Sequence, residues 1–322
     1  MRAARPGAAA GPGDGGASPR LAGELATPAR SAGRATLVVN ATIFGGLAGY
    51  SVQRSSGSDD PRLLYPLLAV GAGVGLGGSM IVSEEWDVGI GDAWYLAAAA
   101  WWPTLAGHLI YEGRFAEHAG DADNERWAFG LVSGTTGIAI GSVFLSISGV
   151  GEGAAMLAHS GGGLGAMFGG LSELFARGDI YRTPFAGIGY GAGLGWLAAA
   201  TFARVQVPTA RVLTVDLGAV LGGLGGAALA SPLLFDTPEA AEQRGWLGAT
   251  AGAAVIGAGL AWWLTRPSKP VPGAEGGPGG SPPETGLLAG VRGTPLFGVI
   301  GESQVASASV PIYGLGWRGP LP

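Results

Sequence analysis

Eight stretches of the chain between residues 34 and 265 contain no Asp, Glu, Lys or Arg, and each is 19 to 25 residues long. A helix needs about 20 apolar residues to cross a hydrocarbon layer about 30 Å thick, whereas a strand of a membrane barrel needs only about 9 to 11. The lengths therefore predict eight membrane-spanning helices, with the charged residues confined to the connections. The stretches are residues 35–53, 63–82, 93–111, 127–151, 153–172, 183–203, 217–235 and 245–265.

The composition agrees with this prediction. Only 13% of the 322 residues are charged, about half the usual share, while 48% are hydrophobic and 63 are glycine. So few charges cannot cover the surface of a large water-soluble protein, and so many apolar side chains exclude disorder for most of the length. The absence of cysteine excludes disulfides, thiolate metal sites and thiol nucleophiles. The net charge of −5 argues against a nucleic-acid partner.

The eight stretches make up one predicted domain, residues 34–265, and three other segments flank it. Residues 1–33 are rich in Ala, Gly, Pro and Arg, which predicts a disordered arm. This arm contains no apolar run of the length that a cleavable secretory signal needs. Residues 266–285 have the composition of a Pro/Gly-rich flexible linker. The tail, residues 286–322, is expected to form a short β-hairpin.

The uncharged stretches also show signs of an internal repeat. An arginine precedes each even-numbered stretch, at Arg62, Arg126, Arg182 and Arg244, so the period is about 60 residues. Two spans in each unit keep successive units in the same orientation across a membrane. We therefore predict an all-α, polytopic membrane bundle of about eight glycine-rich helices, arranged as four parallel two-helix repeats.

Glycines recur at a spacing of four residues in seven of the eight stretches. Helices in lipid lack a hydrophobic drive to associate and depend on close backbone packing, which glycine permits. The third stretch has no such stripe and instead carries several aromatic residues, so it is expected to be either a peripheral helix or one anchored at the membrane interface. The predicted packing glycines are Gly45, Gly49, Gly73, Gly77, Gly137, Gly141, Gly161, Gly165, Gly169, Gly187, Gly191, Gly195, Gly218, Gly222, Gly226, Gly248 and Gly252.

A transmembrane β-barrel is the alternative architecture. Residues 70–77 and 187–195 alternate glycine with larger residues at a period of two, which strands would also show. Barrel strands, however, alternate apolar with polar residues and turn about every ten residues. Alanine runs such as 97–100 and 198–200 favour helix.

No motif in the sequence indicates catalysis. A phosphate-binding loop needs Gly-Lys-Ser/Thr, and the only lysine, Lys269, lies between a serine and a proline. The Gly-x-Ser-x-Gly elbow of serine hydrolases is absent. A glycine run with an acid about 20 residues later occurs at residues 187–195 and Asp216, but no strand precedes the glycines and Asp216 is expected in a loop. We therefore expect no enzyme activity, no cofactor and no metal.

Polar residues inside the stretches are the remaining candidates for a site. His159 lies in the middle of the fifth stretch, where an ionisable group is costly and faces either a partner or a water-filled cavity. Asn40 is a further polar residue at membrane depth. His108 and Glu112 are one helical turn apart and could bind a metal or pass a proton, or could simply lie at the interface. A hydrogen bond between helices explains His159 and Asn40 equally well.

The Asp-Asp-Pro-Arg loop at 59–62, the Gly-Asp-Ala-Trp start at 91–94 and the paired Gly/Ala-rich spans resemble multispanning membrane proteins of GC-rich bacteria. The resemblance covers about residues 34–265 and implies no activity. It agrees with an integral protein of the bacterial inner membrane. Expected partners are the lipid bilayer and either further copies of this chain or other membrane proteins.

Three functions are compatible with these features, and the last of them is a membrane enzyme that works through His108 and Glu112. The first is a non-enzymatic structural, scaffolding or assembly role in the membrane. The second is a transporter or channel, with a path between the parallel two-helix repeats and with His159 on that path.

Overall fold

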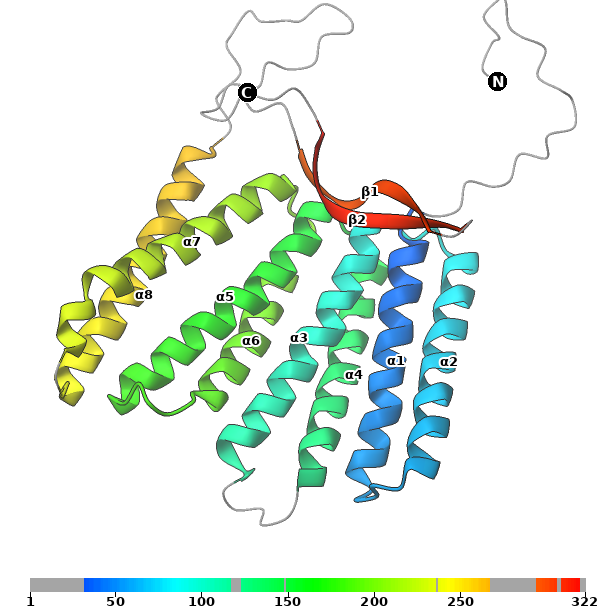
Figure 1. The fold of residues 1–322 in the computed structure, drawn as a ribbon, viewed down its shortest axis with the longest axis horizontal. Helices are drawn as coiled ribbons and strands as arrows, with labels where there is room; N and C mark the ends of the chain where they lie inside the picture. The colour runs from blue at the N-terminus through cyan, green and yellow to red at the C-terminus, as the bar shows by residue number, and fades with distance from the viewer. Residues whose placement is uncertain are drawn as a thin grey trace, which may run out of the picture.

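A computed structural model describes residues 32–116, 123–147, 149–235 and 237–266, together with the backbone of two strands near the C-terminus. Within residues 34–265, the described part consists of eight α-helices and one short 3-10 turn, η2, at Ser231–Leu234 (Figure 1). The all-α prediction is confirmed for this domain, and the barrel alternative is wrong there. The helices are α1 Arg34–Ser55, α2 Pro61–Glu85, α3 Ile90–Arg114, α4 Asp123–Ile147, α5 Glu152–Arg177, α6 Phe185–Ala200, α7 Thr209–Leu229 and α8 Ala240–Leu264.

Five of these helices, α1, α2, α4, α7 and α8, are long and apolar enough to cross a membrane. The apolar helix α6 is shorter, with 16 residues, and so spans about 24 Å. Helices α3 and α5 have 25 and 26 residues, which is long enough to cross a hydrocarbon layer about 30 Å thick. Both lie among the other helices. The protein is therefore an integral membrane protein with a helical bundle.

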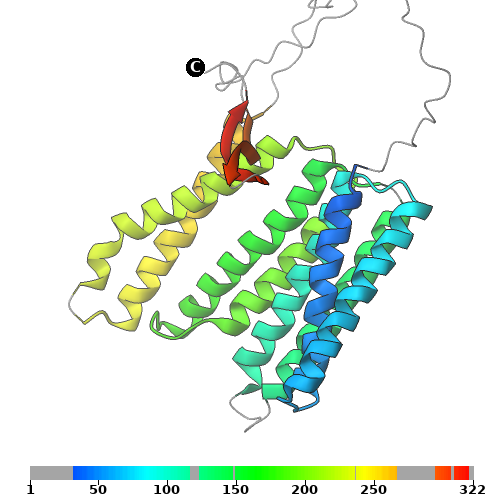
Figure 2. The same cartoon turned by 45° about the vertical axis from the view of Figure 1, so that its right-hand side comes forward.

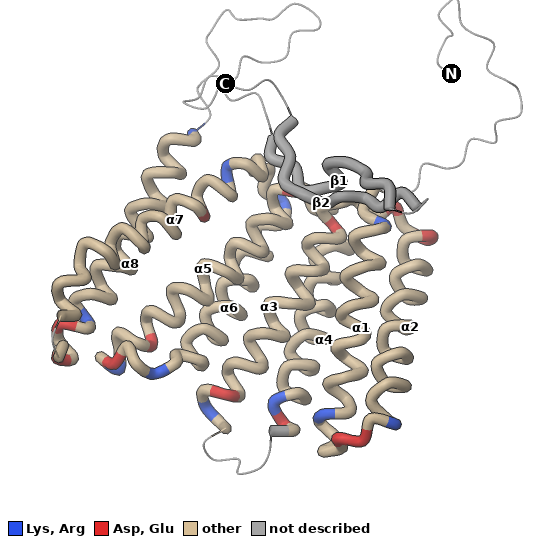
Figure 3. Tube along the Cα trace, in the orientation of Figure 1, with Lys and Arg blue, Asp and Glu red and all other residues tan. Residues whose placement is uncertain are grey.

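Charged residues gather at the two ends of the helices and leave the middle of the bundle nearly free of charge (Figure 3). At one end Arg34 pairs with Glu84, at 2.5 Å between nitrogen and oxygen. At the other end Arg54 pairs with Asp59. This distribution matches a bilayer, because charges avoid the hydrocarbon layer and gather in the headgroup regions.

Each odd-numbered helix packs along the even-numbered helix that follows it, which gives four helical hairpins. The hairpins stand side by side in a row, and the α7–α8 hairpin leans away from the others (Figures 1 and 2). All four begin at the same end of the bundle. Gly33 before α1 donates to Val88 O before α3, and Gly91 in α3 lies against Val150 before α5. Four parallel hairpins are the arrangement that the predicted repeat requires, while a repeat in the sequence itself stays a prediction.

Glycine contacts between backbones hold the α5–α6 hairpin together. A Cβ added to any of six glycines, three on each helix, would come within 3.0 Å of an atom of the other helix. Such a distance is not tolerated, so the two backbones touch because side chains are missing. These glycines are Gly161, Gly165 and Gly169 on α5 and Gly187, Gly191 and Gly195 on α6.

The same kind of contact occurs in the other hairpins. An added Cβ would lie within 3.0 Å of the neighbouring helix at Gly45 and Gly49 of α1, at Gly137 and Gly141 of α4, and at Gly218, Gly222 and Gly226 of α7. The opposing residues include Leu67, Gly71 and Gly75 on α2, Ala99 and Pro103 on α3, and Ala249, Ala253 and Gly257 on α8.

Four predicted packing glycines do not take part in this close packing. An added Cβ at Gly73, Gly77 or Gly252 would meet nothing within 4 Å, and at Gly248 it would meet only the edge of the Phe175 ring at 3.6 Å. The predicted role within the chain is therefore wrong for these four. On α2 the contact falls on Gly71 and Gly75 instead. A shift of two residues along a helix corresponds to about 200° of rotation about its axis. The predicted spacing of four residues is therefore correct, but Gly73 and Gly77 lie on the face of α2 that points away from α1.

The prediction that the third stretch is a peripheral helix is also wrong. Helix α3 contacts α1, α4, α5 and α6, and its alanine run at 97–100 is buried. Tyr95 is fully buried and donates from its hydroxyl group to Ala200 O at 3.1 Å. Alanine, like glycine, allows close backbone approach, so this helix packs centrally without a glycine stripe.

The seventh helix begins eight residues before its uncharged stretch, at Thr209, and ends at Leu229 rather than at Phe235. Asp216 therefore lies inside α7, and its predicted place in a loop is wrong. Pro208 directly precedes the helix, and proline is favoured at a helix start because its missing N–H needs no partner there.

Near the C-terminus, strand β1 at Thr294–Val305 pairs antiparallel with strand β2 at Ala308–Arg318, and Pro295 lies opposite Trp317. Residues 1–31 of the predicted arm and the predicted linker from residue 267 onward lie outside the described residues.

Candidate functional site

His159 bridges α5 to α3 through both of its ring nitrogens. Trp102 Nε1 donates to His159 Nδ1 at 3.3 Å, and His159 Nε2 lies 3.1 Å from Trp94 O. A neutral ring with its proton on Nε2 satisfies both contacts at once, since Nδ1 then accepts and Nε2 donates. The two polar groups that His159 offers are thus both used in joining helices.

Trp102 also packs flat against the glycines of α5. A Cβ on Gly162 would lie within 3.0 Å of the Trp102 ring, and one on Gly163 would lie 3.7 Å from it. Glycine on α5 therefore makes the space that the indole fills. Among the aromatic residues of α3, Tyr95 is buried and Trp101 and Trp102 are half-buried, whereas Trp94 is 46% exposed.

Ser160, next to His159, makes the second polar bridge of α5. Its hydroxyl group donates to the carboxylate of Asp216 in α7. Both side chains are only partly exposed. His159 and Ser160 thus face different neighbours, α3 and α7, and α5 lies between two hydrogen-bonded partners at membrane depth.

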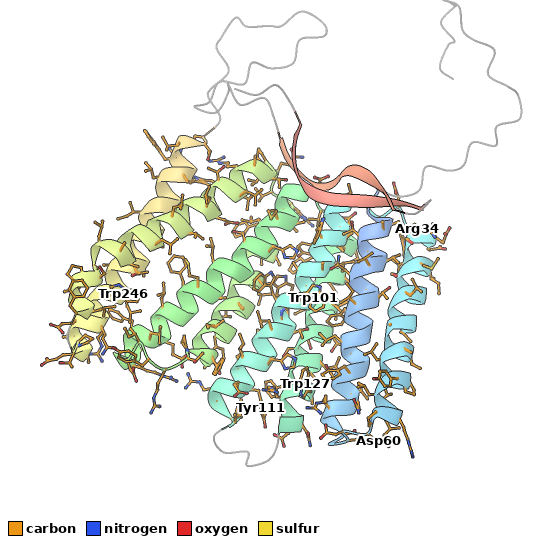
Figure 4. All side chains as sticks on the ribbon, viewed as in Figure 1. Arg34, Asp60, Trp101, Tyr111, Trp127 and Trp246 are labelled. Atoms are coloured by element: carbon orange, nitrogen blue, oxygen red, sulfur yellow. The ribbon has the colours of Figure 1, made fainter. Side chains whose placement is uncertain are left out.

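Asn40 has the same role on α1. Its amide nitrogen donates to Thr36 O one turn earlier at 3.0 Å, and its carbonyl oxygen accepts from Trp101 Nε1 at 3.3 Å. Trp101 lies near the middle of the bundle (Figure 4). An indole N–H buried in an apolar layer needs an acceptor, and Asn40 supplies it from a neighbouring helix.

The structure does not join His108 and Glu112 in a site. Glu112 pairs with Arg126 of α4, at 3.3 Å between Nη1 and Oε2. His108 lies edge-on to Trp127, with 4.9 Å between ring centroids, and covers Gly130. Each residue therefore connects α3 to α4. Within the described residues no group of three or more His, Asp or Glu side chains is placed to hold a metal ion.

Two acidic residues with clear roles were not predicted as candidates. Asp216 could have been found from the helix start at Pro208, which places the acid two turns inside α7. Glu173 accepts from Gly187 N in the first turn of α6 at 2.5 Å and also pairs with Arg177. A carboxylate at this position satisfies a free N–H at the start of a short helix. Only the tertiary contact reveals that role.

One cavity, of about 650 Å³, lies where the α4–α5 and α6–α7 connections meet, at the end of the bundle where the odd-numbered helices begin. It is lined by Gly149, residues 151–154 and residues 203–208, with Glu152 and Arg204 among them. His159 and Asp216 do not line this cavity. It therefore does not lead to the polar bridges of α5.

Comparison of the chain with protein-family models, with curated proteins and with solved structures finds no match.

Replacing His159 by alanine should lower the stability of the bundle by about 1–2 kcal/mol, because Trp102 Nε1 and Trp94 O then lose their partner. The matched control is Ser172→Ala on the same helix, whose hydroxyl bonds only to Phe168 O of its own helix. We expect a lower melting temperature in detergent for His159→Ala and almost no change for the control. Equal melting temperatures for both variants would contradict the bridging role.

Proposed function

We propose that the protein is a non-enzymatic scaffold of the bacterial inner membrane, whose hairpins provide lateral contacts for lipids and other membrane proteins. The observation that carries this proposal is the open row of hairpins. The principal contacts of the α1–α2 hairpin are with α3 and α4, and those of the α7–α8 hairpin are with α5. A row of this kind offers long sides to the membrane, and its eight described helices enclose no central path between the first and last hairpins.

The polar groups of the bundle support the same proposal. His159, Ser160, Asp216 and Asn40 each have a partner on a neighbouring helix. A transport path needs groups that remain available to a passing solute or ion. Groups that are engaged with each other contribute to the assembly of the bundle instead.

A reconstitution experiment tests the scaffold against the transporter. Vesicles that contain the protein should pass protons, potassium and small solutes no faster than empty vesicles. Asp216→Asn should leave these rates unchanged as well. Flux above that of empty vesicles, lost in Asp216→Asn or His159→Ala, would replace the scaffold by the transporter.

Cross-linking tests directly whether the protein makes the lateral contacts that a scaffold needs. The chain has no cysteine, so single cysteines can be introduced without interference. Ile256 on α8 is 71% exposed, whereas Ser79 on α2 is buried. In native membranes Ile256→Cys should form a cross-linked species of defined mass, and Ser79→Cys should not. If no cross-linked species forms with cysteine at position 256 or at other exposed positions, the scaffold role is contradicted.

A further inference from the structure

A pocket of about 590 Å³ lies at the end of the bundle where α3 and α5 end and α6 begins. Arg114, the last residue of α3, and Arg177, the last residue of α5, are part of its lining. Charged residues gather at this end of the helices, next to the uncharged middle of the bundle (Figure 3). The pocket therefore lies at the level where a bilayer has its headgroups.

Contacts with α6 fix Arg114 beside the pocket. A Cβ added to Gly113 would lie within 3.0 Å of Ala186 N, so the end of α3 touches the first turn of α6. The central carbon of the Arg114 guanidinium group lies 5.7 Å from the centre of the Tyr190 ring, one turn further along α6. A cation within about 6 Å of an aromatic ring is attracted to the face of that ring. Both contacts hold Arg114 against the lining.

The charges of the lining do not balance. The lining contains two arginines, Arg114 and Arg177, and one acid, Glu173. Both carboxylate oxygens of Glu173 are engaged, since Oε2 accepts from Gly187 N at 2.5 Å and Oε1 pairs with Arg177. In the described part of the chain, Arg114 forms no ion pair with a carboxylate. One positive charge in the pocket is therefore uncompensated.

The other end of the pocket is apolar. Leu194 is part of the lining and lies seven residues beyond Gly187, which corresponds to about 10 Å along α6. Between these two ends, Gly169 and Gly191 line the pocket where the backbones of α5 and α6 touch. The pocket thus has a positive wall at headgroup level and an apolar wall towards the middle of the bundle.

We propose that this pocket binds a phosphate group, with Arg114 as its principal contact. A guanidinium group can donate two parallel hydrogen bonds to two phosphate oxygens. A phosphate diester carries one negative charge, which balances the uncompensated charge of Arg114. The headgroups of membrane phospholipids carry such a group at this level, and soluble phosphate compounds are a second source of the same chemistry. The site does not depend on the scaffold role and would be present in a transporter as well.

Two substitutions and one matched control test the site. Arg114→Gln removes the uncompensated charge. Ser172→Phe fills the pocket and leaves every charge in place, because Ser172 is part of the lining and its hydroxyl group bonds only to Phe168 O of its own helix. The control is Arg62→Gln, since Arg62 lies exposed at the start of α2, at the same end of the bundle and outside the pocket.

Each full-length variant is purified in a neutral detergent and titrated with phosphatidylglycerol, and bound lipid is counted by native mass spectrometry. The first phosphatidylglycerol should bind the wild type about tenfold more tightly than it binds Arg114→Gln or Ser172→Phe, because charge-assisted hydrogen bonds are lost or blocked. Arg62→Gln should match the wild type within about twofold. Melting temperatures close to that of the wild type show that the variants are folded.

Two further ligands identify the group that is bound and its source. Diacylglycerol has the same acyl chains without the phosphate, so its binding should not differ between the wild type and Arg114→Gln. If a large excess of inorganic phosphate leaves phosphatidylglycerol bound, the phosphate belongs to a phospholipid. If an equal concentration of inorganic phosphate displaces the lipid, the site takes a soluble phosphate compound.

Three results would overturn the proposal. Equal affinities of Arg114→Gln and Arg62→Gln for phosphatidylglycerol would mean that only the net charge of the surface matters. Wild-type affinity in Ser172→Phe would mean that the ligand lies outside the pocket. Diacylglycerol binding as tight as that of phosphatidylglycerol would mean that the phosphate group is not recognised.

Discussion

Replacing Gly165 by leucine should prevent α5 and α6 from packing and destabilise the protein by about 4 kcal/mol or more. A Cβ on Gly165 would already overlap Gly191 O and lie 3.0 Å from Gly195 Cα, both of which are backbone atoms that cannot move aside alone. The two helices would have to separate along the contact that joins the hairpin. We expect a decrease in the melting temperature in detergent of about 10 °C or more, or a loss of monodisperse protein.

The control for this experiment is Gly73→Leu. An added Cβ at Gly73 meets nothing within 4 Å, so leucine there faces outward from α2. The substitution adds the same apolar volume and the same gain in helix propensity as Gly165→Leu. Its melting temperature should stay close to that of the wild type. Equal losses in both variants would mean that any leucine is harmful and that close contact at Gly165 is not the cause.

Replacing Trp102 by alanine should cost about 3 kcal/mol, because the indole fills the space above Gly162 and donates to His159. Trp263→Ala on α8 is the matched control, since Trp263 is 59% exposed. Thermal unfolding in detergent should show a clear loss for Trp102→Ala and a change below about 1 kcal/mol for Trp263→Ala. Trp102→Phe should fall between them, since it keeps one aromatic ring and loses the second ring and the N–H donor.

This pair of variants distinguishes a core residue from an interface anchor. An anchor at the headgroup level contributes little to packing between helices. If Trp102→Ala were as stable as Trp263→Ala, the packing of Trp102 inside the bundle would contribute nothing measurable to the free energy of unfolding.

Several features of the fold were predictable because the bilayer imposes them on the sequence. A hydrocarbon layer requires about 20 uncharged residues per helix and satisfied backbone hydrogen bonds, so counting charges located the helices. The fourfold glycine spacing likewise indicated backbone contact. In the α5–α6 hairpin every predicted glycine, such as Gly165 and Gly191, lies against the opposite helix.

The face of a helix that packs was less predictable. On α2, glycines occur at both 71 and 75 and at 73 and 77, and each pair has the same spacing. Only the position of α1 decides that Gly71 and Gly75 make the contact. The central position of α3 was likewise not visible, because alanine and tryptophan are equally compatible with a buried helix and a peripheral one.

The candidate polar residues show the same division. The sequence placed His159 and Asn40 at membrane depth, where polar groups need partners. It could not name those partners, because Trp102 lies 57 positions from His159 and Trp101 lies 61 positions from Asn40. It also put Asp216 outside the helix, since a charge normally marks the end of a span. The hydroxyl group of Ser160 on another helix is what makes its position inside α7 acceptable.

The amino-acid sequence by itself determined that this protein is a membrane-embedded helical bundle and roughly where its helices lie, the seventh excepted, because the transfer of charge and backbone into hydrocarbon depends on local composition. The tertiary structure alone decided which glycines touch, which helix lies at the centre and which polar groups pair. Those outcomes depend on the rotation of each helix and on its neighbours, and a periodic pattern of small residues leaves both undetermined.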